Sequence, residues 1–355
     1  MRPGCSRLFA LKNILITGGA GFFGDLLKKD LLREGFACVS IDLERDPFRH
    51  PGLKAVRGDI RDVSLLDAIC RETRFDAVFH CAAILAHAVK DKNFLWTSNV
   101  DGTRNIAEVA KRHGIPRVVF TSSNCLWAKN FGRPVMEDDE PEPAEIYGLS
   151  KWEGEKILAE YAGDFINVTF RCPTIMDEGR LGLLAILFEF IDEGRKVWVV
   201  GGGDNIYQFI CARDLITACK LALRHDKSGV FNIGSDNVRS FRDVYGYVIE
   251  KAGTGSRVAS LPKAPTLLAM RLAYWLKVSL LGPYQYKMIA EDFVFDTGKI
   301  KAELQWKPTL TNEEMLYNAY LYYHKNLADI KGRKDVSAHK QAAKMGIIRL
   351  LKWFS

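Results

Sequence analysis

The sequence predicts an α/β protein built on a doubly wound parallel sheet, with a smaller C-terminal lobe. Short apolar runs of strand length alternate with stretches of helical periodicity from about residue 14 to residue 172. The first of these strands leads directly into a glycine-rich turn, and the alternation loosens after Pro173. Since crossovers between parallel strands are right-handed and carry helices, this order predicts helices on both faces of one sheet.

Composition limits the class of protein. The chain has 355 residues, of which 48% are hydrophobic, enough for a large core and a second lobe. The sequence contains no run of 18 uncharged apolar residues, so no membrane span is expected. The first 11 residues lack the apolar core of a signal peptide. The eight cysteines are scattered without a C-x-x-C pair. We therefore expect no metal site and no disulfides, as in a reducing cytoplasm.

The net charge of +7 is concentrated at the C-terminus. Residues 325–355 contain eight basic and two acidic residues, so the rest of the chain is balanced, with 42 basic and 41 acidic residues. A balanced body argues against a broad nucleic-acid-binding surface.

The first strand, turn and helix predict a dinucleotide site. Residues 14–16 form an apolar run typical of a buried strand, and leucines recur with helical spacing from residue 26 to residue 32. Without side chains, the intervening glycines let backbone N–H groups approach a pyrophosphate, whose charge is stabilised by the helix N-terminus. The glycines fit both G-x-G-x-x-G and G-x-x-G-x-x-G, and the alternative is a plain tight turn. They are Gly18, Gly19, Gly21 and Gly24.

The other elements follow in order. Strands are expected at 37–42, 54–58, 76–80, 117–121 and 165–171, and later at 196–200, 207–211 and 230–233. Helices are expected from 59, at about 94–113, from 147, at 181–190 and at 214–223.

Asp42 ends the second strand and is the candidate for the adenosine ribose. It lies 18 residues beyond Gly24, close to the spacing at which an acid binds the ribose hydroxyls. A carboxylate there repels a 2′-phosphate, which favours NAD over NADP, although Arg45 could partly offset it. The alternative is a solvated aspartate at the end of a strand.

Tyr147 and Lys151 are four residues apart, so a helix places both side chains on one face. A free tyrosine has a pKa of about 10 and is a poor base at neutral pH. An ammonium roughly 4 Å away would stabilise the phenolate by roughly 4 kcal/mol at an effective dielectric of about 20, or about three pKa units. With the hydroxyl of Ser123, which ends the preceding strand, these groups suffice to deprotonate an alcohol while its carbon gives hydride to a nicotinamide.

Together these motifs resemble the extended short-chain dehydrogenase/reductase family, which contains nucleotide-sugar epimerases, dehydratases and 3β-hydroxysteroid dehydrogenases. The resemblance covers roughly residues 12 to 325. It rests on Asp42 and on segments 17–24, 58–60, 80–83, 99–105, 120–123, 147–151, 171–173, 209–214 and 301–308. It implies a Rossmann NAD-binding domain over 1–174 with returning segments at about 205–235, a substrate-binding lobe over 175–204 and 236–325, and a basic amphipathic tail over 326–355.

The resemblance implies a role for each matching residue. Tyr147 would be the base, Lys151 would bind the nicotinamide ribose, and Ser123 would be the hydroxyl partner. NAD is the implied cofactor, with its pyrophosphate at Gly18, Gly21 and Gly24, its ribose at Asp42 and its adenine at Asp59 and Ile60. The rest of the cofactor groove is assigned to Phe22, Phe23, Ala82, Ala83, Asn99, Ser122, Cys172 and Pro173.

Departures from the family pattern narrow the activity. Asn124 and Cys125 stand where 4,6-dehydratases carry an acid pair, so dehydration is not expected, and residues 126–128 replace the usual Val-Tyr-Gly. Thr174 stands near the position where many UDP-sugar epimerases have an asparagine that touches the nucleotide phosphates, which argues against binding of a UDP-sugar. Cys125 falls where a related epimerase–reductase group has an acid/base cysteine. Because no histidine partner is apparent in 171–180, we interpret it as a packing residue.

Two segments near the C-terminus are apolar and basic. Residues 261–282 predict a lid or substrate-lobe helix, with a membrane-dipping element as the alternative. Residues 346–354 predict a short amphipathic helix that contacts a membrane surface. The alternative is docking on the body or on a dimer partner. We expect a cytoplasmic homodimer, peripheral on the inner membrane face if the tail binds lipid.

The leading hypothesis is an NAD-dependent epimerase of a nucleotide-linked or lipid-linked sugar, working through a keto intermediate. The alternative is an NAD(P)-dependent alcohol dehydrogenase or ketoreductase of the 3β-hydroxysteroid type, with a sterol-like substrate. A non-catalytic cofactor sensor is disfavoured, because Ser123, Tyr147 and Lys151 are all present.

Overall fold

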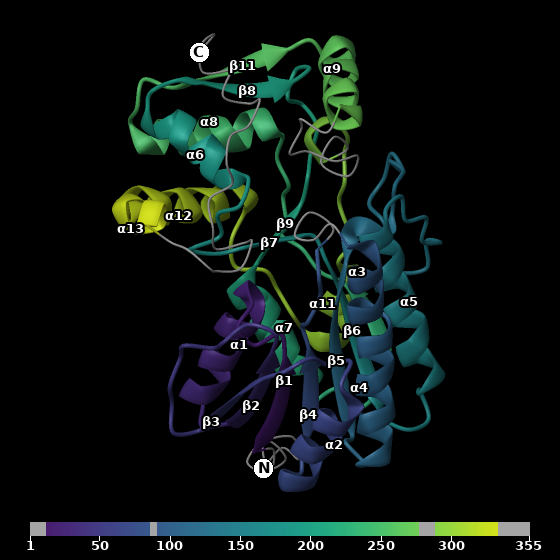
Figure 1. Ribbon diagram of the computed structural model, residues 1–355. Helices are drawn as coiled ribbons and strands as arrows, with labels where there is room; N and C mark the ends of the chain where they lie inside the picture. The colour runs from purple at the N-terminus through teal and green to yellow at the C-terminus, as the bar shows by residue number, and fades with distance from the viewer. Residues whose placement is uncertain (1–11, 86–90, 277–287, 333–355) are drawn as a thin grey trace.

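The computed structural model describes residues 12–85, 91–276 and 288–332. Its centre is a parallel sheet of seven strands (Figure 1). These are β1 (Asn13–Thr17), β2 (Ala37–Asp42), β3 (Leu53–Arg57), β4 (Ala77–His80), β5 (Arg117–Ser123), β6 (Ile166–Cys172) and β10 (Gly229–Asn232). Their order is β10-β6-β5-β4-β1-β2-β3, and every neighbouring pair is parallel. The order reverses between β1 and β4, and doubly wound sheets bind ligands at this point.

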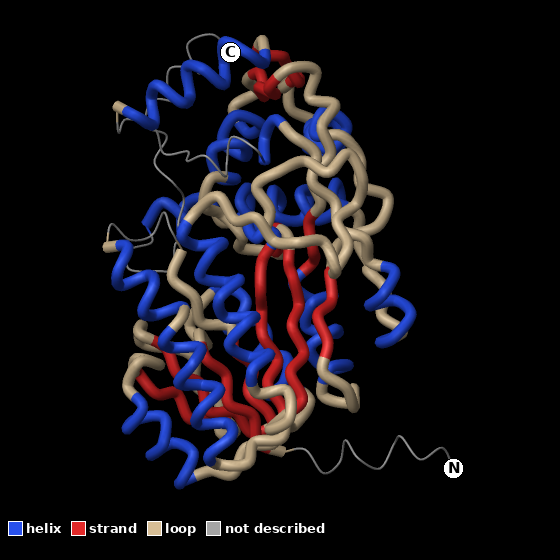
Figure 2. The backbone as a smooth tube through the Cα atoms, turned by 90° about the vertical axis from the view of Figure 1, so that its right-hand side faces the viewer, coloured by secondary structure: helices blue, strands red, loops and turns tan. Residues whose placement is uncertain are grey.

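Helices cover both faces of the sheet, which confirms the predicted doubly wound class (Figure 2). On one face α1 (Phe22–Arg33), α7 (Ala212–Ala222) and α11 (Gly298–Leu304) bury apolar side chains against the strands. The other face is covered by α2 (Val63–Glu72), α4 (Asp101–Arg112) and α5 (Ile146–Glu160), and α3 (Lys92–Asn99) packs beside α4 and α5.

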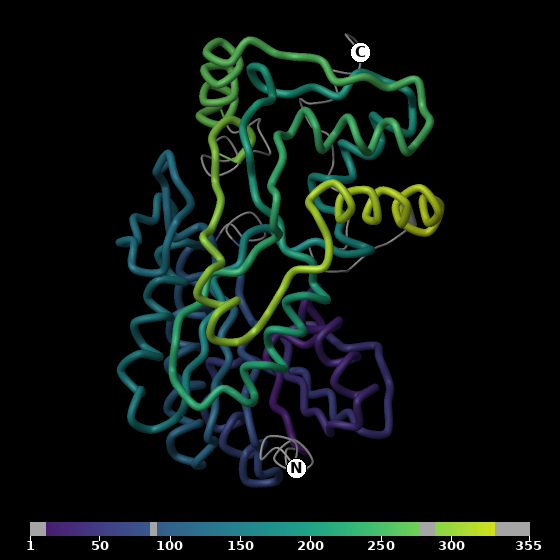
Figure 3. The backbone as a smooth tube through the Cα atoms, turned by 180° about the vertical axis from the view of Figure 1, so that it is seen from behind, coloured from purple at the N-terminus to yellow at the C-terminus, as the bar shows by residue number. Residues whose placement is uncertain are grey.

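The smaller lobe has a core of its own and lies at the top of Figures 1 and 3. A parallel pair, β8 (Lys196–Val200) and β11 (Arg257–Leu261), packs with α6 (Leu184–Asp192) and α8 (Phe241–Ala252). The lobe is completed by α9 (Lys263–Trp275), α12 (Asn312–Lys325) and α13 (Leu327–Gly332).

A second short pair, β7 (Thr174–Met176) and β9 (Phe209–Cys211), joins the two cores. In β9 the side chain of Ile210 belongs to the core on the sheet, whereas Phe209 and Cys211 belong to the core of the lobe. Because successive strand residues point to opposite faces, three residues suffice to connect both cores.

Several expected boundaries need correction. The helix expected at 94–113 is two helices divided near Val100, where the Thr103 hydroxyl donates to the Asn99 carbonyl oxygen. The helix expected from Asp59 begins at Val63, because Asp62 accepts the Leu65 amide as its N-cap.

The expected division into lobe and tail also changes. Residues 298–306 were assigned to the substrate lobe, but α11 and Trp306 pack in the core on the large sheet. The tail was expected from residue 326, but α13 is a helix whose Ile330 is buried in the lobe core. The amphipathic segment 346–354, and the end of the segment 261–282 beyond Leu276, lie outside the described residues. Within the described part of the chain no helix is long and apolar enough to cross a membrane.

Trp306 anchors the C-terminal part of the chain to the sheet. Its side chain is 1% exposed, and its indole Nε1 donates to the Asp214 carbonyl oxygen at 2.8 Å. We predict that Trp306→Ala lowers the free energy of unfolding by about 3–5 kcal/mol, because it leaves a large cavity and an unpaired carbonyl. Trp275→Ala is the control: that side chain is 77% exposed, so a change of less than about 0.5 kcal/mol is expected in denaturant unfolding. If the two variants lost the same free energy of unfolding, the placement of Trp306 in the core on the sheet would be contradicted.

Candidate active site

Helix α5 brings Tyr147 and Lys151 to the carboxyl ends of β5 and β6. A close backbone contact sets its position, since a Cβ at Gly148 would lie 2.1 Å from the Cys125 carbonyl oxygen. The helix therefore runs against the short 3₁₀ turn η2 (Asn124–Leu126) that follows Ser123. The predicted Ser123–Tyr147–Lys151 group is thus assembled on neighbouring elements.

A buried ion pair holds α5 against the sheet. Arg171 of β6 donates from Nε and Nη2 to the Glu155 carboxylate, with the shortest contact at 2.8 Å, and from Nη1 to the Glu137 carbonyl oxygen. Its guanidinium lies 5.0 Å from the ring centroid of Trp127. Glu155 is one turn beyond Lys151, so this pair fixes the same helix that carries the catalytic candidates.

Tyr147 faces a cavity of about 280 Å³ between the sheet and the lobe. Among the predicted residues, Ser122, Ser123, Tyr147, Cys172 and Pro173 line this cavity. Most of the other lining side chains are apolar. The charged ones among the lining residues are Glu145 and Arg180.

The electrostatics of Tyr147 differ from the sequence-based expectation. Burial, followed by the neighbouring Cys125 and Cys172 thiols, holds the pKa of the phenol above its ordinary value. The groups that lower this pKa are Arg180, through its charge, and Ser123, through a hydrogen bond, rather than Lys151. Lys151 is not among the groups that lower this pKa in the unliganded protein, so its action on the phenolate stays a prediction.

Lys151 is a buried ammonium without a hydrogen-bond acceptor among the described residues. The residue is 3% exposed, and Nζ lies 4.2 Å from the ring centroid of Phe120. Burial lowers its pKa to about 8, and the nearby Cys81 and Cys172 thiols and Glu155 oppose that shift. An unpaired donor at this position can bind hydroxyl oxygens such as those of a ribose.

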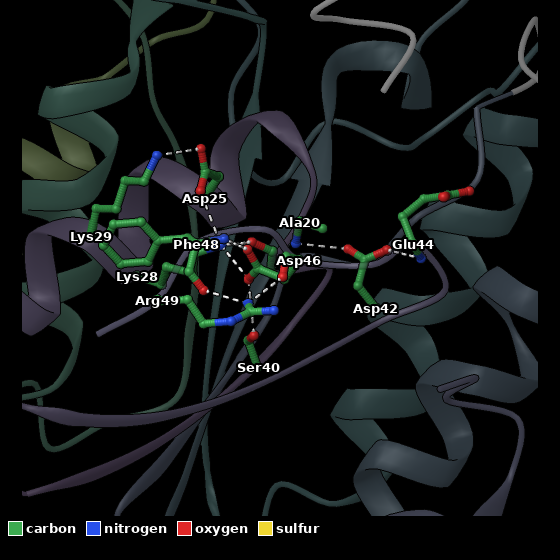
Figure 4. A network of polar contacts seen from close by, with 11 residues as sticks. Ala20, Asp25, Lys28, Lys29, Ser40, Asp42, Glu44, Asp46, Phe48 and Arg49 are labelled. Carbon is green, nitrogen blue, oxygen red and sulfur yellow. Dashed lines mark hydrogen bonds and ion pairs between the residues drawn. The ribbon is translucent and has the colours of Figure 1, made fainter. Parts of the chain in front are cut away.

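A network of polar contacts centred on Lys28 supports the glycine turn (Figure 4). The Lys28 side chain is fully buried, and Nζ donates to the Gly19 carbonyl oxygen at 2.7 Å. It also pairs with Asp46 from the loop after β2 and, at 3.0 Å, with Asp25 from its own helix. The network therefore connects the turn, helix α1 and the β2–β3 loop.

Asp42 lies at the edge of the same turn. Its carboxylate accepts the Ala20 amide at 2.9 Å and the Glu44 amide at 3.0 Å (Figure 4). Asp42 is partly exposed, and its contact with the adenosine ribose stays a prediction.

Other predicted cofactor residues take different positions. The Asn99 amide is engaged by the loop after β4: it donates to the Ile84 carbonyl oxygen and to Ser150 Oγ, each at 3.0 Å, and accepts the Ile84 amide. It therefore shapes the groove at Ala82 and Ala83 indirectly. Phe23 packs in the core, and Phe22 lies beneath Arg180, at 5.5 Å from the guanidinium to the ring centroid. Ile60 packs against Gly102, and Asp59 pairs with Arg61.

The residues present fit a bound dinucleotide. A Cβ at Gly24 would lie 2.2 Å from the Gly18 carbonyl oxygen, so only glycine permits this tight turn at the start of α1. Its N-cap, Gly21, has no side chain to occupy the anion-binding end of the helix. Ser122 Oγ is buried without a hydrogen-bond partner in the described structure, as expected for an atom that awaits a ligand.

Two contributors to the site were not predicted from the sequence. Lys28 falls on the apolar face of α1, one turn after Gly24 and one turn before Leu32, so helical periodicity alone could have marked it as buried. Arg180 comes from the irregular segment after β7, where no local pattern identifies it.

The chain is similar to a known protein family and to proteins of known structure. The model of the family described as "NAD dependent epimerase/dehydratase family" matches residues 14–234. A Sinorhizobium fredii protein named y4nG, described as uncharacterized, is 37% identical over 97% of this chain and 86% of its own length. UDP-glucose 4-epimerase of Lactobacillus helveticus is 27% identical over 88% of this chain and 97% of its own length.

A lipid-linked substrate is named for another relative. The N-acetyl-alpha-D-glucosaminyl-diphospho-ditrans,octacis-undecaprenol 4-epimerase of Escherichia coli O157:H7 is 28% identical over 66% of this chain and 67% of its own length. Among solved structures, the Bordetella bronchiseptica enzyme WbmG in complex with NAD has a TM-score of 0.74 at 23% identity, covering 92% of this chain and 96% of that one.

The Lys28 network yields a prediction about cofactor binding. Lys28→Met leaves the Asp46 and Asp25 carboxylates without their buried cation, so we expect a loss of about 3–5 kcal/mol in the free energy of unfolding. Lys28→Met/Asp46→Leu removes the buried pair and should recover most of that loss. Both variants remove the hydrogen bond to the Gly19 carbonyl oxygen. The Kd for NAD, measured by calorimetry, should therefore rise at least about tenfold in both, which corresponds to ~1.4 kcal/mol of binding free energy.

Lys29→Met is the control for this series. Lys29 pairs with Asp25 at 3.0 Å and lies 5.0 Å from the ring centroid of Phe48, and its side chain is 37% exposed, so both measurements should stay close to the wild type. If the double variant binds NAD as tightly as the wild type, the network supports only the fold.

The pKa of Lys151 predicts a pH-dependent stability. Its pKa of about 8 in the folded protein lies below the ordinary 10.5, so the unfolded chain binds the proton more tightly. The resulting penalty is absent above about pH 10.5, grows as the pH falls to 8, and is complete below that, at about 3 kcal/mol. In the absence of NAD, Lys151→Met should therefore raise the free energy of unfolding at pH 7. The difference between the variant and the wild type should shrink toward pH 10. If denaturant titrations gave the same difference in free energy of unfolding between the variant and the wild type from pH 7 to pH 10, the lowered pKa of Lys151 would be contradicted.

Proposed function

The chain belongs to the NAD-dependent epimerase/dehydratase family, and on this premise we propose that it epimerises a sugar linked to a nucleotide or to a lipid. The observation that supports the reaction best is the Ser123–Tyr147–Lys151 group beside the cavity, next to a glycine turn that fits a dinucleotide. Its cofactor is NAD, as the family description states.

Each residue has a defined task in this proposal. Tyr147 removes the proton from a sugar hydroxyl, and the Ser123 hydroxyl holds the same oxygen by a hydrogen bond. Arg180 stabilises the phenolate, and Lys151 donates to the nicotinamide ribose, so its ammonium gains the acceptors that it lacks in the unliganded protein. When bound beside this group, NAD would supply the hydride acceptor for the oxidation and the hydride donor for the reduction of the keto sugar. Tyr147 then gives its proton back, and no net oxidation follows.

Epimerisation is favoured over dehydration by the groups next to Ser123. The positions where the resemblance expects an acid pair hold Asn124 and Cys125. Asn124 is buried and donates to the Tyr207 hydroxyl at 2.6 Å, and Cys125 places its carbonyl oxygen against α5 at Gly148, so neither position holds a carboxylic acid. A 4,6-elimination needs an acid and a base at the leaving hydroxyl, so this site supports turnover of the keto sugar without elimination.

The class of sugar carrier is supported by the relatives. Two of them are named for a UDP-linked and an undecaprenyl diphosphate-linked sugar, and Arg180 places a positive charge at the cavity where either diphosphate could bind. A second candidate, a hydroxysteroid-type alcohol dehydrogenase, is favoured by the apolar wall that Leu181, Leu183 and Phe209 give to the cavity.

Substrate conversion tests the proposal. The NAD-loaded protein should convert a UDP-hexose, a UDP-N-acetylhexosamine or a polyprenyl diphosphate sugar to its epimer, as followed by chromatography of the released sugar. Tyr147→Phe should lower kcat by about 10²–10⁴-fold, because the proton acceptor is lost. Tyr161→Phe, the same change at the far end of α5, is the control and should leave kcat unchanged. Release of NADH in step with product, with a sterol as substrate, would favour the dehydrogenase instead.

A further inference from the structure

Helix α9 exposes an apolar stripe that nothing in the described structure covers. Leu268, Leu272, Trp275 and Leu276 recur at the spacing of one helix face and are 60%, 52%, 77% and 60% exposed. No residue of α9 is buried. In the described part of the chain seven large apolar side chains are exposed, and five of them lie in 268–276, so the exposure is concentrated on this helix.

The helix lies at the outer edge of the lobe, apart from the sheet. Figures 1 and 3, taken from opposite sides, both show α9 at this edge. It follows β11 directly and ends close to the limit of the described residues at Leu276. A flat surface can therefore approach it without contacting the sheet domain.

The charges on α9 and on the strand before it are of one sign. Between Arg257 and Leu276 the chain contains three basic residues, Arg257, Lys263 and Arg271, and no acidic residue. All three are exposed. A second copy of the chain that paired through this helix would bring like charges together, whereas an anionic surface would complement them.

We propose that α9 docks on an anionic phospholipid bilayer. Leu268, Leu272 and Trp275 enter the boundary between headgroups and acyl chains, with the Trp275 indole at the interface. Arg271 lies beside the stripe and reaches lipid phosphates with its long side chain, and Lys263, at the first residue of the helix and on its other side, adds to the positive charge of the segment. Contact of this kind is peripheral, and the proposal is independent of the sugar that the cavity binds.

Vesicle binding by the full-length, NAD-loaded protein tests this proposal. Vesicles of phosphatidylcholine with phosphatidylglycerol should co-sediment with the protein, and vesicles of phosphatidylcholine alone should bind at least tenfold less of it. On the anionic vesicles, amide hydrogen exchange in 263–276 should slow at least fivefold. This local measurement separates α9 from any contact made by the basic C-terminal segment.

Three variants separate the contributions. Leu268→Ser/Leu272→Ser/Trp275→Ser should lower the fraction bound to anionic vesicles at least tenfold and abolish the slowed exchange, with an unchanged Kd for NAD showing that the protein is folded. Lys263→Glu/Arg271→Glu should lower binding to anionic vesicles at least fivefold. Met136→Ser is the control, because Met136 is an apolar residue outside α9 that is 46% exposed. This variant should bind anionic vesicles as well as the wild type does.

Three results would overturn the proposal. The first is unchanged hydrogen exchange in 263–276 on anionic vesicles. The second is full vesicle binding by the triple serine variant. The third is slowed exchange in 263–276 that rises with protein concentration in the absence of lipid, which would assign the stripe to a contact between copies of the chain.

Discussion

A buried ammonium group must be compensated, and the two buried lysines of the sheet domain meet this constraint in opposite ways. Lys28 has a carbonyl and two carboxylates around it, so its charge is neutralised and it serves as a structural tie. Lys151 has an aromatic ring and no hydrogen-bond acceptor in the described structure, so its pKa falls. The lysine that is poorly compensated is the one to which the proposed function assigns a ligand, and its buried charge lowers the stability of the folded protein.

The same division of roles extends to the arginines. Arg171 is buried with its hydrogen bonds to Glu155 and to a carbonyl oxygen, and it holds α5 on β6. Arg180 borders the cavity and lowers the pKa of Tyr147 through its charge. The site therefore combines a rigid frame of satisfied polar groups with Lys151 and Ser122, which have no hydrogen-bond partner in the described structure.

The cavity lies between two cores that are joined by short elements. Helix α5, the turn after Ser123 and the β7–β9 pair bring residues of the sheet domain and the lobe to its walls. Most of the lobe is covered, since α6, α8 and α12 bury its core, whereas α9 at its edge keeps its apolar stripe exposed. The lobe thus has one surface that lines the cavity and a separate, exposed surface on α9.

The sequence by itself determined the sheet, the glycine turn, the position of Asp42 at the end of a strand, and the placement of Tyr147 and Lys151 on one helix. Strand and helix periodicity and the spacing of four residues are local properties, so each can be deduced from a few neighbouring letters. Tertiary structure alone decided the partners of Lys28, the charge beside Tyr147, the packing of α11 and Trp306, and the exposure of α9. Asp46 is 18 residues from Lys28, and Arg180 is 33 residues from Tyr147 and on a different element. The physical reason is that pKa and exposure depend on which distant segments meet, and local spacing carries no record of those contacts.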